Sequence, residues 1–285
     1  SQGEGGARVQ LPPATNNALP VIYGRAYVAP VITDAKISTD QKFMWYVCSL
    51  SEYTETTPGS VFTFGDIYWN GNLINGVTGA SSNVTSWTNN AGQTDYKMAG
   101  KIQIYKFPNG STSGTNTGGL SAIDILSDPT TGGGIQPNLR WDSGLYTDPN
   151  NTKSADMTNT CFLLVRVEYN QDAGTTGLGT LTVELTNSVT KPGDVILDYM
   201  LNTRYGCAIP PSRIDTASLT DLNTYSDQTI TYTDIDSNPA TQARYRVNGP
   251  VNVTNTCLTN LQQLADNCDS WLQYSDIEDK WKMVM

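Results

Sequence analysis

Two apolar runs on either side of an Asn70-Gly71 pair constrain the fold of this chain more than any other feature (VFTFGDIYW before the pair, NLI after it). A type I′ hairpin turn needs positive φ at both central residues, and Asn followed by Gly is the pair that meets this need most readily. We therefore predict an antiparallel hairpin here. The abundance of Thr, Tyr, Asn and Gly extends the argument, because these residues suit pleated strands and the tight turns between them.

Three further segments follow strand patterns. The run FMWYVCSL at residues 43–50 is apolar on both faces, as expected of a central strand. The segments KIQIYKF at 101–107 and LGTLTVELT at 178–186 alternate like half-buried strands. These patterns predict a β-rich, sandwich-like or barrel-like domain over residues 19–190.

Two stretches of low hydrophobicity flank or interrupt this domain. Residues 1–18 are rich in Gly, Pro and Asn, and we expect them to form an extended N-terminal arm. The polar stretch at about 108–157 is too long for an ordinary loop. We interpret it as an insertion that projects from the sheet.

A helical pattern begins after a Lys-Pro-Gly sequence near residue 190. Asp194 is the expected N-cap of a short helix, and Gly206 suits its C-terminal cap. A second helix is expected to begin at Asp215 or Ser218, and a third helix is expected to be capped by Thr254 or Asn255, followed by an aromatic hairpin. Residues 191–285 are therefore predicted to form a smaller α+β domain, which makes the whole chain mainly β with a few short helices.

The chain contains no histidine, and this absence excludes several functions. Ser-His-Asp and Cys-His catalysis, HExxH metalloproteases and imidazole general bases all require one. The excess of 27 acidic over 17 basic residues argues against stable nucleic-acid binding, which depends on neutralising phosphates. No apolar stretch approaches the roughly 20 residues that span a bilayer. Carboxylate-pair chemistry, carbohydrate binding and structural roles remain.

Neither the cysteines nor the glycines suggest a cofactor or metal. The five cysteines show no CxxC pairing, and we expect them to be reduced core or near-core residues of a protein that folds in a reducing cytoplasm. No phosphate-binding glycine motif is present, so no cofactor is expected. The sequence DIDSN at 234–238 resembles part of a calcium loop but lacks its later Gly and Glu, and we interpret it as a solvated turn.

Aromatic and acidic residues give two weaker signals of binding or catalysis. Trp87 and Trp141 lie in polar segments and are possible exposed contact residues, whereas most other aromatics fit sheet packing. A carboxylate-dependent glycosidase would need a pair of acids. The candidates for such a pair are Asp124, Asp142, Glu168, Asp194 and Asp198.

The order of motifs resembles one known family. The segment VILDYMLNTRYGCAIPPSRID at 195–215 is followed by a strand with an Arg, a helix with a Leu-x-x-Leu-Ala core and a hairpin ending Trp-Lys-Met-Val. Upstream, LPVIYGRAYV, FMWYVCSLSE and GDIYWNG occur in order. This set is similar to the central tail-tip proteins of long-tailed bacteriophages, the family of the lambda tip attachment protein J. The resemblance covers about residues 19–75 and 190–285.

The resemblance implies a non-enzymatic structural virion protein. It implies a β-rich baseplate-hub fold and a homotrimer that closes the distal end of the tail tube, assembled in the bacterial cytoplasm and located at the tail tip of the virion. Its implied partners are the distal tail ring protein, the tape measure protein and fibre or receptor-binding proteins. Because family members continue into fibre segments, we expect either a part of a longer protein or a version with a separate fibre chain.

Around the NTRYG segment at 202–206 we expect a structural motif formed by Asp198, Arg204, Tyr205 and Gly206. The Arg204 guanidinium could bridge helix carbonyls or a carboxylate such as Asp198, and an exposed arginine without a fixed partner is the alternative. Two other functions stay open for the chain as a whole. One is a carbohydrate-binding adhesin module, and the other is a carboxylate-dependent glycosidase acting on host surface polysaccharide.

Overall fold

The described part of the protein is mostly β, as predicted, with 44% of the described residues in strands and 17% in helices. The computed structural model describes residues 18–37, 42–52, 54, 62–108 and 159–285. The N-terminal arm and the polar insertion expected from the sequence lie outside the described residues, apart from their last or first positions.

The chain divides into two compact units. The first takes its described residues mainly from Tyr27–Tyr53 and Phe62–Leu185, and the second from Pro20–Ala26, Thr54 and Thr186–Met285. The sequence predicted a domain boundary near residue 190. The second unit also includes the Pro20–Ala26 segment, which contributes a strand from the far end of the sequence.

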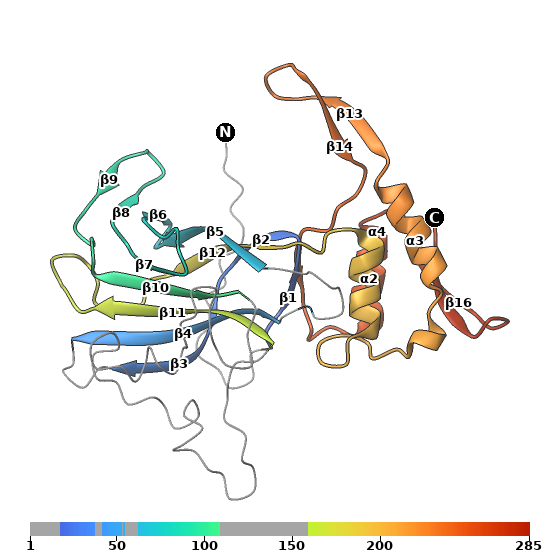
Figure 1. Ribbon diagram of the computed structural model, residues 1–285, viewed down its shortest axis with the longest axis horizontal. Helices are drawn as coiled ribbons and strands as arrows, with labels where there is room; N and C mark the ends of the chain where they lie inside the picture. The colour runs from blue at the N-terminus through green and yellow to red at the C-terminus, as the bar shows by residue number, and fades with distance from the viewer. Residues whose placement is uncertain (1–17, 38–41, 53, 55–61, 109–158) are drawn as a thin grey trace, which may run out of the picture. The chain divides into compact units, whose positions relative to one another are not determined.

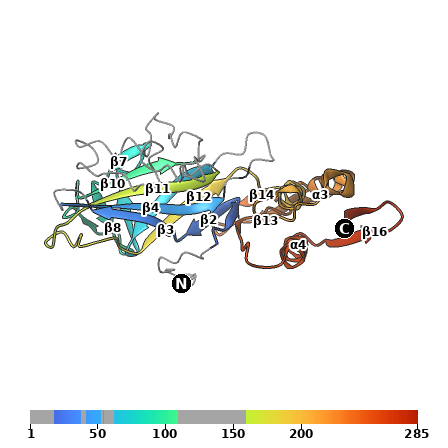
Figure 2. The ribbon, with the colours of Figure 1, turned by 90° about the horizontal axis from the view of Figure 1, so that it is seen from below.

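The first unit contains two sheets whose strands pair with antiparallel neighbours. In the first sheet β3 (Val31–Ile37) pairs with β4 (Phe43–Glu52), which is followed by β11 (Thr160–Glu168), β10 (Ile102–Phe107) and β7 (Ser81–Asn83). In the second sheet the order is β2 (Arg25–Val28), β12 (Leu181–Asn187), β5 (Phe62–Trp69), β6 (Asn72–Asn75), β8 (Ser86–Thr88) and β9 (Thr94–Asp95). Figure 1 and Figure 2 show β4, β11 and β10 running side by side.

The strand at β4 is central and buried on both faces, which confirms the expectation from FMWYVCSL. On one face Trp45 stacks on Tyr105 of β10 with ring centroids 5.8 Å apart. On the other face the buried Cys48 lies opposite the buried Leu163 of β11. Every residue from Trp45 to Ser51 except Tyr46 is buried, and pairing with β3 and β11 covers the two edges of the strand.

The Asn70-Gly71 hairpin is confirmed. Asn70 has φ 50° and Gly71 has φ 82°, the two positive values that a type I′ turn needs. Trp69 lies opposite Asn72 across the turn. The Asn70 side chain also accepts a hydrogen bond from the backbone N–H of Thr180 at 2.8 Å, which ties the turn to the segment before β12.

The second unit combines three helices with short strands. Its helices are α2 (Pro192–Leu201), α3 (Thr216–Ser226) and α4 (Cys257–Asp266). Its strands form three antiparallel pairs: β1 (Val21–Tyr23) with β15 (Gly249–Val251), β13 (Thr229–Thr233) with β14 (Pro239–Ala243), and β16 (Trp271–Ser275) with β17 (Lys280–Val284). A short 3₁₀ helix at Pro211–Arg213 precedes α3.

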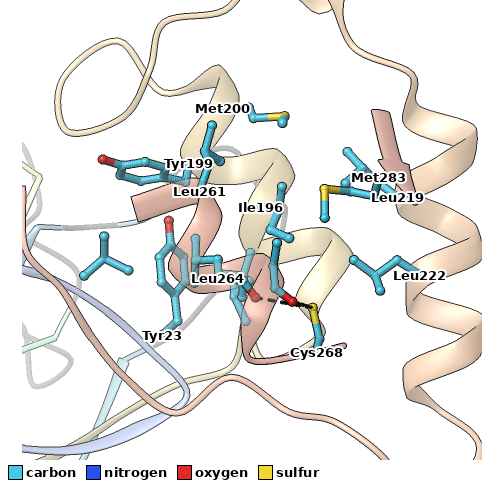
Figure 3. Close-up of a cluster of buried hydrophobic side chains, with 14 of the residues drawn as sticks. Tyr23, Ile196, Tyr199, Met200, Leu219, Leu222, Leu261, Leu264, Cys268 and Met283 are labelled. Carbon is cyan, nitrogen blue, oxygen red and sulfur yellow. Dashed lines mark hydrogen bonds between the residues drawn. The ribbon is translucent and has the colours of Figure 1, made fainter. Parts of the chain in front are cut away.

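The core of the second unit lies between these helices. Figure 3 shows Ile196 of α2, Leu222 of α3 and Leu264 of α4 converging, and all three are buried. Met283 of β17 joins the same cluster. Burying each such side chain contributes about 1.5–3 kcal/mol, so the helices depend on one another more than on their own helical propensity.

Two of the three expected N-caps are wrong, and one is right. The first helix begins earlier than expected, with Lys191 at the N-cap and Pro192 at the first position, where a missing N–H costs nothing. Asp194 therefore lies in the first turn. The third helix is capped by Thr256 and not by Thr254 or Asn255. Asp215 caps the second helix as expected, accepting hydrogen bonds from two backbone N–H groups.

Gly193 allows α2 and α3 to approach closely, so adding a side chain at this position should destabilise the protein. A Cβ atom at this position would lie 2.1 Å from the Leu219 carbonyl oxygen. Gly193→Ala should lower the free energy of unfolding by about 1–3 kcal/mol because of this clash. The clash opposes the intrinsic helix preference of alanine over glycine, which is about 1 kcal/mol. Urea denaturation measures the change.

The matched control is Gly177→Ala, because a Cβ at Gly177 meets only the Tyr46 hydroxyl at 3.9 Å. It should unfold like the original protein. A Gly193→Ala protein as stable as this control would show that the two helices can separate without cost.

Candidate functional site

A buried carboxylate lies at the centre of the motif expected from NTRYG. Asp198 of α2 is only 1% exposed. Its Oδ2 atom accepts hydrogen bonds from the hydroxyl groups of Tyr23, at 2.5 Å, and Tyr205, at 2.7 Å. Tyr23 belongs to β1 and Tyr205 follows α2, so one carboxylate joins three segments of the second unit. Two hydroxyl donors offset part of the cost of burying the charge.

The turn after α2 brings Tyr205 back to the helix. The side-chain oxygen of Asn202 accepts hydrogen bonds from the backbone N–H groups of Arg204 and Tyr205, at 2.8 and 3.1 Å. The backbone N–H of Cys207 donates to the Tyr199 carbonyl at 2.8 Å. A Cβ atom at Gly206 would lie 2.1 Å from that same carbonyl oxygen. Gly206 is therefore needed for close approach, and the helix ends at Leu201 with Asn202 as its C-cap.

Arg204 lies at the surface beside this motif. Its side chain is exposed, and its guanidinium lies 5.5 Å from the centre of the Tyr205 ring. A cation over an aromatic face at an exposed position contributes about 0.5–1 kcal/mol. The structure thus brings Asp198, Tyr205 and Gly206 together around the end of α2, with Arg204 covering the outer face of the tyrosine.

Burial raises the pKa of both tyrosines in the motif, and the charge of Asp198 raises it further. Ionising either hydroxyl would place a second negative charge beside the carboxylate and remove a hydrogen-bond donor. The motif is therefore suited to holding the fold together, because its protons cannot leave at neutral pH.

Tyr205→Phe should lower the free energy of unfolding by about 1–3 kcal/mol, since it leaves the buried Asp198 carboxylate with one donor fewer. A tyrosine whose folded pKa lies above its unfolded value of about 10 stabilises the fold fully below pH 10 and loses that contribution as the pH rises further. The stability deficit of the variant should therefore shrink above pH 10.

Urea denaturation between pH 7 and 11 measures this dependence. The matched control is Tyr232→Phe, which removes a hydroxyl from an exposed strand and should change nothing. A Tyr205→Phe protein with an unchanged midpoint would contradict the structural role of the motif.

Trp87 lines a pocket in the first unit. It is half-buried on β8, and its cross-strand neighbours are Ile74 of β6 and Asp95 of β9. The pocket has a volume of ≈ 580 Å³. Its lining consists of aromatic, amide, hydroxyl and charged side chains: Asn72, Trp87, Asn89, Gln93, Thr94, Asp95, Tyr96 and Lys97. Trp141, the other possible contact aromatic, lies outside the described residues.

A rigid turn supports one wall of this pocket. The Asn89 side-chain oxygen accepts hydrogen bonds from the backbone N–H groups of Ala91 and Gln93, at 3.0 and 2.9 Å. Its amide nitrogen donates to the Gln93 side chain at 3.0 Å. The backbone N–H of Lys97 and the indole of Trp87 donate to the Asp95 carboxylate and lower its pKa, so this acceptor stays ionised.

The carboxylates considered for a glycosidase have structural contacts where they are described. Glu168 forms an ion pair with Lys101 at 2.6 Å, and Asp194 accepts a hydrogen bond from Asn223 at 2.8 Å. Asp124 and Asp142 lie outside the described residues. The side chain of Asp234 closes the turn between β13 and β14 by accepting hydrogen bonds from two backbone N–H groups. Across the described ranges, no three His, Cys, Asp or Glu side chains form a group that could hold a metal ion.

All five cysteines fall within the described residues and are free thiols, as expected. Cys48, Cys161 and Cys268 are buried and Cys207 is half-buried, but Cys257 is exposed, so the expectation of a core position is wrong for it. Cys257 begins α4, where its thiol lies 3.7 Å from the Gly206 carbonyl oxygen.

These positions predict the thiol chemistry of the protein. Burial raises the pKa of Cys48 to about 12, and it also raises the pKa values of Cys161, Cys207 and Cys268. Only the thiolate reacts quickly. With Ellman's reagent at pH 8, the native protein should react rapidly at Cys257 alone, and all five thiols should react in guanidinium. Cys257→Ser should abolish the rapid phase. Rapid reaction of several thiols in the native state would contradict the buried positions.

Comparisons with known proteins add no family assignment: no protein-family model matches the chain, and no curated protein matches it. None of the helices in the described part of the chain is both long enough and apolar enough to cross a membrane.

The sequence had identified Trp87, Asp198 and Tyr205 but missed Tyr23 and Tyr96, which complete the two sites. Tyr23 lies 175 residues from Asp198, and no local spacing could have paired them. Tyr96 could have been found from the sequence, because Gly92 indicates a turn after Trp87. The hairpin of β8 and β9 then brings the following residues back beside Trp87.

Proposed function

We propose that this chain is a structural virion protein, a homotrimeric tail-tip or baseplate-hub component that closes the distal end of a phage tail tube and links it to host-attachment parts. The family in this proposal comes from the resemblance of the ordered sequence motifs at about residues 19–75 and 190–285. The structural observation that supports an assembly role is the hairpin formed by β13 and β14.

This hairpin is exposed on both faces. Every residue of β13 is exposed, including Ile230 at 37% and Tyr232 at 44%, and Ile235 in the turn is 98% exposed. Figure 1 shows the hairpin extending from the end of α3 away from the helices of the second unit. A two-stranded hairpin without further packing is at best marginally stable in water, and its open edges invite pairing with another chain.

The base of the hairpin, by contrast, is held firmly. Asp227 forms ion pairs with Lys191 at 2.6 Å and with Arg246 at 2.5 Å. The Arg244 guanidinium lies 4.6 Å from the centre of the Tyr225 ring and donates a hydrogen bond to its hydroxyl at 2.9 Å. A fixed base that carries an exposed hairpin is the arrangement expected of an element that docks onto a neighbouring subunit.

Three apolar residues of the β13–β14 hairpin share one face, where Gln242 lies opposite Ile230. Because residues opposite each other in an antiparallel pair lie on the same side, Ile230, Tyr232 and Ala240 face one way. In the proposed hub this face packs on a second copy of the chain. The distal tail ring, the tape measure protein and the fibre or receptor-binding proteins are the remaining partners, and the virion tail tip is the location.

Replacing Ile230 and Tyr232 together by threonine tests the proposal. Threonine keeps strand propensity while removing the apolar face. Light scattering of the original protein should give a mass near three times that of the 30.9 kDa chain. The double variant should be monomeric, with an unchanged circular dichroism spectrum because both side chains are exposed.

The matched control is Tyr169→Thr, which removes a tyrosine that is exposed to a similar extent from a loop of the first unit. It should remain trimeric. An original chain that is strictly monomeric, and that also fails to bind purified distal tail ring protein, would overturn the hub proposal.

A further inference from the structure

Two aromatic side chains, Trp87 and Tyr96, line the pocket in the first unit. Trp87 is half-buried and therefore fixed, whereas Tyr96 is 69% exposed and lies at the rim. A tyrosine or tryptophan offers a large flat apolar face together with a polar group at its edge. A sugar ring has the matching surface, since its C–H groups form apolar patches between hydroxyl groups.

The polar side chains of the lining can bond the hydroxyl groups of a sugar. Asn72 and Gln93 bring amide groups that both donate and accept, and Asp95 brings a carboxylate that only accepts. A planar amide or carboxylate can bond two adjacent hydroxyl groups at once. Sites for small molecules typically combine aromatic walls with a few such placed polar groups, in volumes of about 300–1,000 Å³.

The pocket is built on a rigid framework. Ser86 and Thr88, which flank Trp87, both accept hydrogen bonds from the Asn75 side chain, at 2.9 and 3.0 Å. Because side chains alternate along a strand, Trp87 points to the opposite face. The Asn89 turn fixes Gln93 on the neighbouring segment. A site that is already ordered loses less entropy when a ligand binds.

The charges disfavour other ligand classes. Asp95 and Lys97 are the only ionised side chains in the lining, and they carry opposite charges. A phosphate or nucleic-acid site would need an excess of cations. An apolar ligand would displace water from the amide and carboxylate groups without offering them any hydrogen bond beyond those they make within the protein, at a cost for each.

We propose that this pocket, formed by β6, β8, β9 and the segments that follow β8 and β9, binds a short neutral saccharide. The ring stacks on Trp87 and Tyr96, and its hydroxyl groups bond Asn72, Gln93 and Asp95. The site goes beyond the hub function, because assembly through the hairpin does not involve it.

Tryptophan fluorescence tests the site with a defined panel of neutral trisaccharides built from glucose, galactose, mannose, rhamnose or N-acetylglucosamine. At least one should give a saturable change at millimolar concentration. Trp87→Ala and Tyr96→Ala should each weaken binding by at least about tenfold, a loss of about 1.4 kcal/mol, with binding of the variants followed by isothermal titration calorimetry. Tyr96→Ala keeps the test valid if Trp87→Ala fails to fold, since its side chain is exposed.

Tyr169→Ala is the matched control and should bind like the original protein. No saturable binding across the panel, or saturable binding of inorganic phosphate alone, would overturn the saccharide site. Binding that Tyr96→Ala leaves unchanged would overturn it as well. Light scattering of the same variants should show unchanged oligomeric state, so this proposal and the hub proposal fail separately.

Discussion

The buried carboxylate of Asp198 is the interaction on which the second unit depends. Its bonds to Tyr23 and Tyr205 connect a strand from the start of the chain, a helix and the turn that follows it. The next residue, Tyr199, accepts a hydrogen bond from Asn260 of α4 at 2.7 Å. A buried charge tolerates few arrangements of its donors, so these two positions fix the neighbours of α2 more narrowly than apolar packing alone.

The surfaces proposed to bind partners and ligands are built on ordered supports. The β13–β14 hairpin projects from an ion-paired base around Asp227. Ser86 and Thr88, on either side of Trp87, are held by hydrogen bonds from Asn75. The exposed face of the hairpin is largely apolar, whereas the pocket combines aromatic, amide and charged side chains. Both rest on supports that are already ordered, so each surface can bind without reorganising the fold.

Short-range patterns predicted much of the structure, because their physical causes are local. The Asn70-Gly71 hairpin follows from the backbone freedom of two residues, and the Asp215 cap follows from one side chain. The central position of β4 follows from a run apolar on both faces. The expected caps at Asp194 and Gly206 were wrong because a proline took the first helical position and a close backbone approach, not a left-handed turn, required the glycine.

By itself the sequence determined a mainly β chain with a smaller helical part, free thiols and no imidazole chemistry, since composition and local periodicity suffice for these. Only the tertiary structure decided that Tyr23 meets Asp198 across 175 residues, that Trp87 and Tyr96 line one pocket, and that the β13–β14 hairpin is exposed on both faces. These features depend on which segments pack together. Packing energy is shared among many distant side chains, and no local pattern records it.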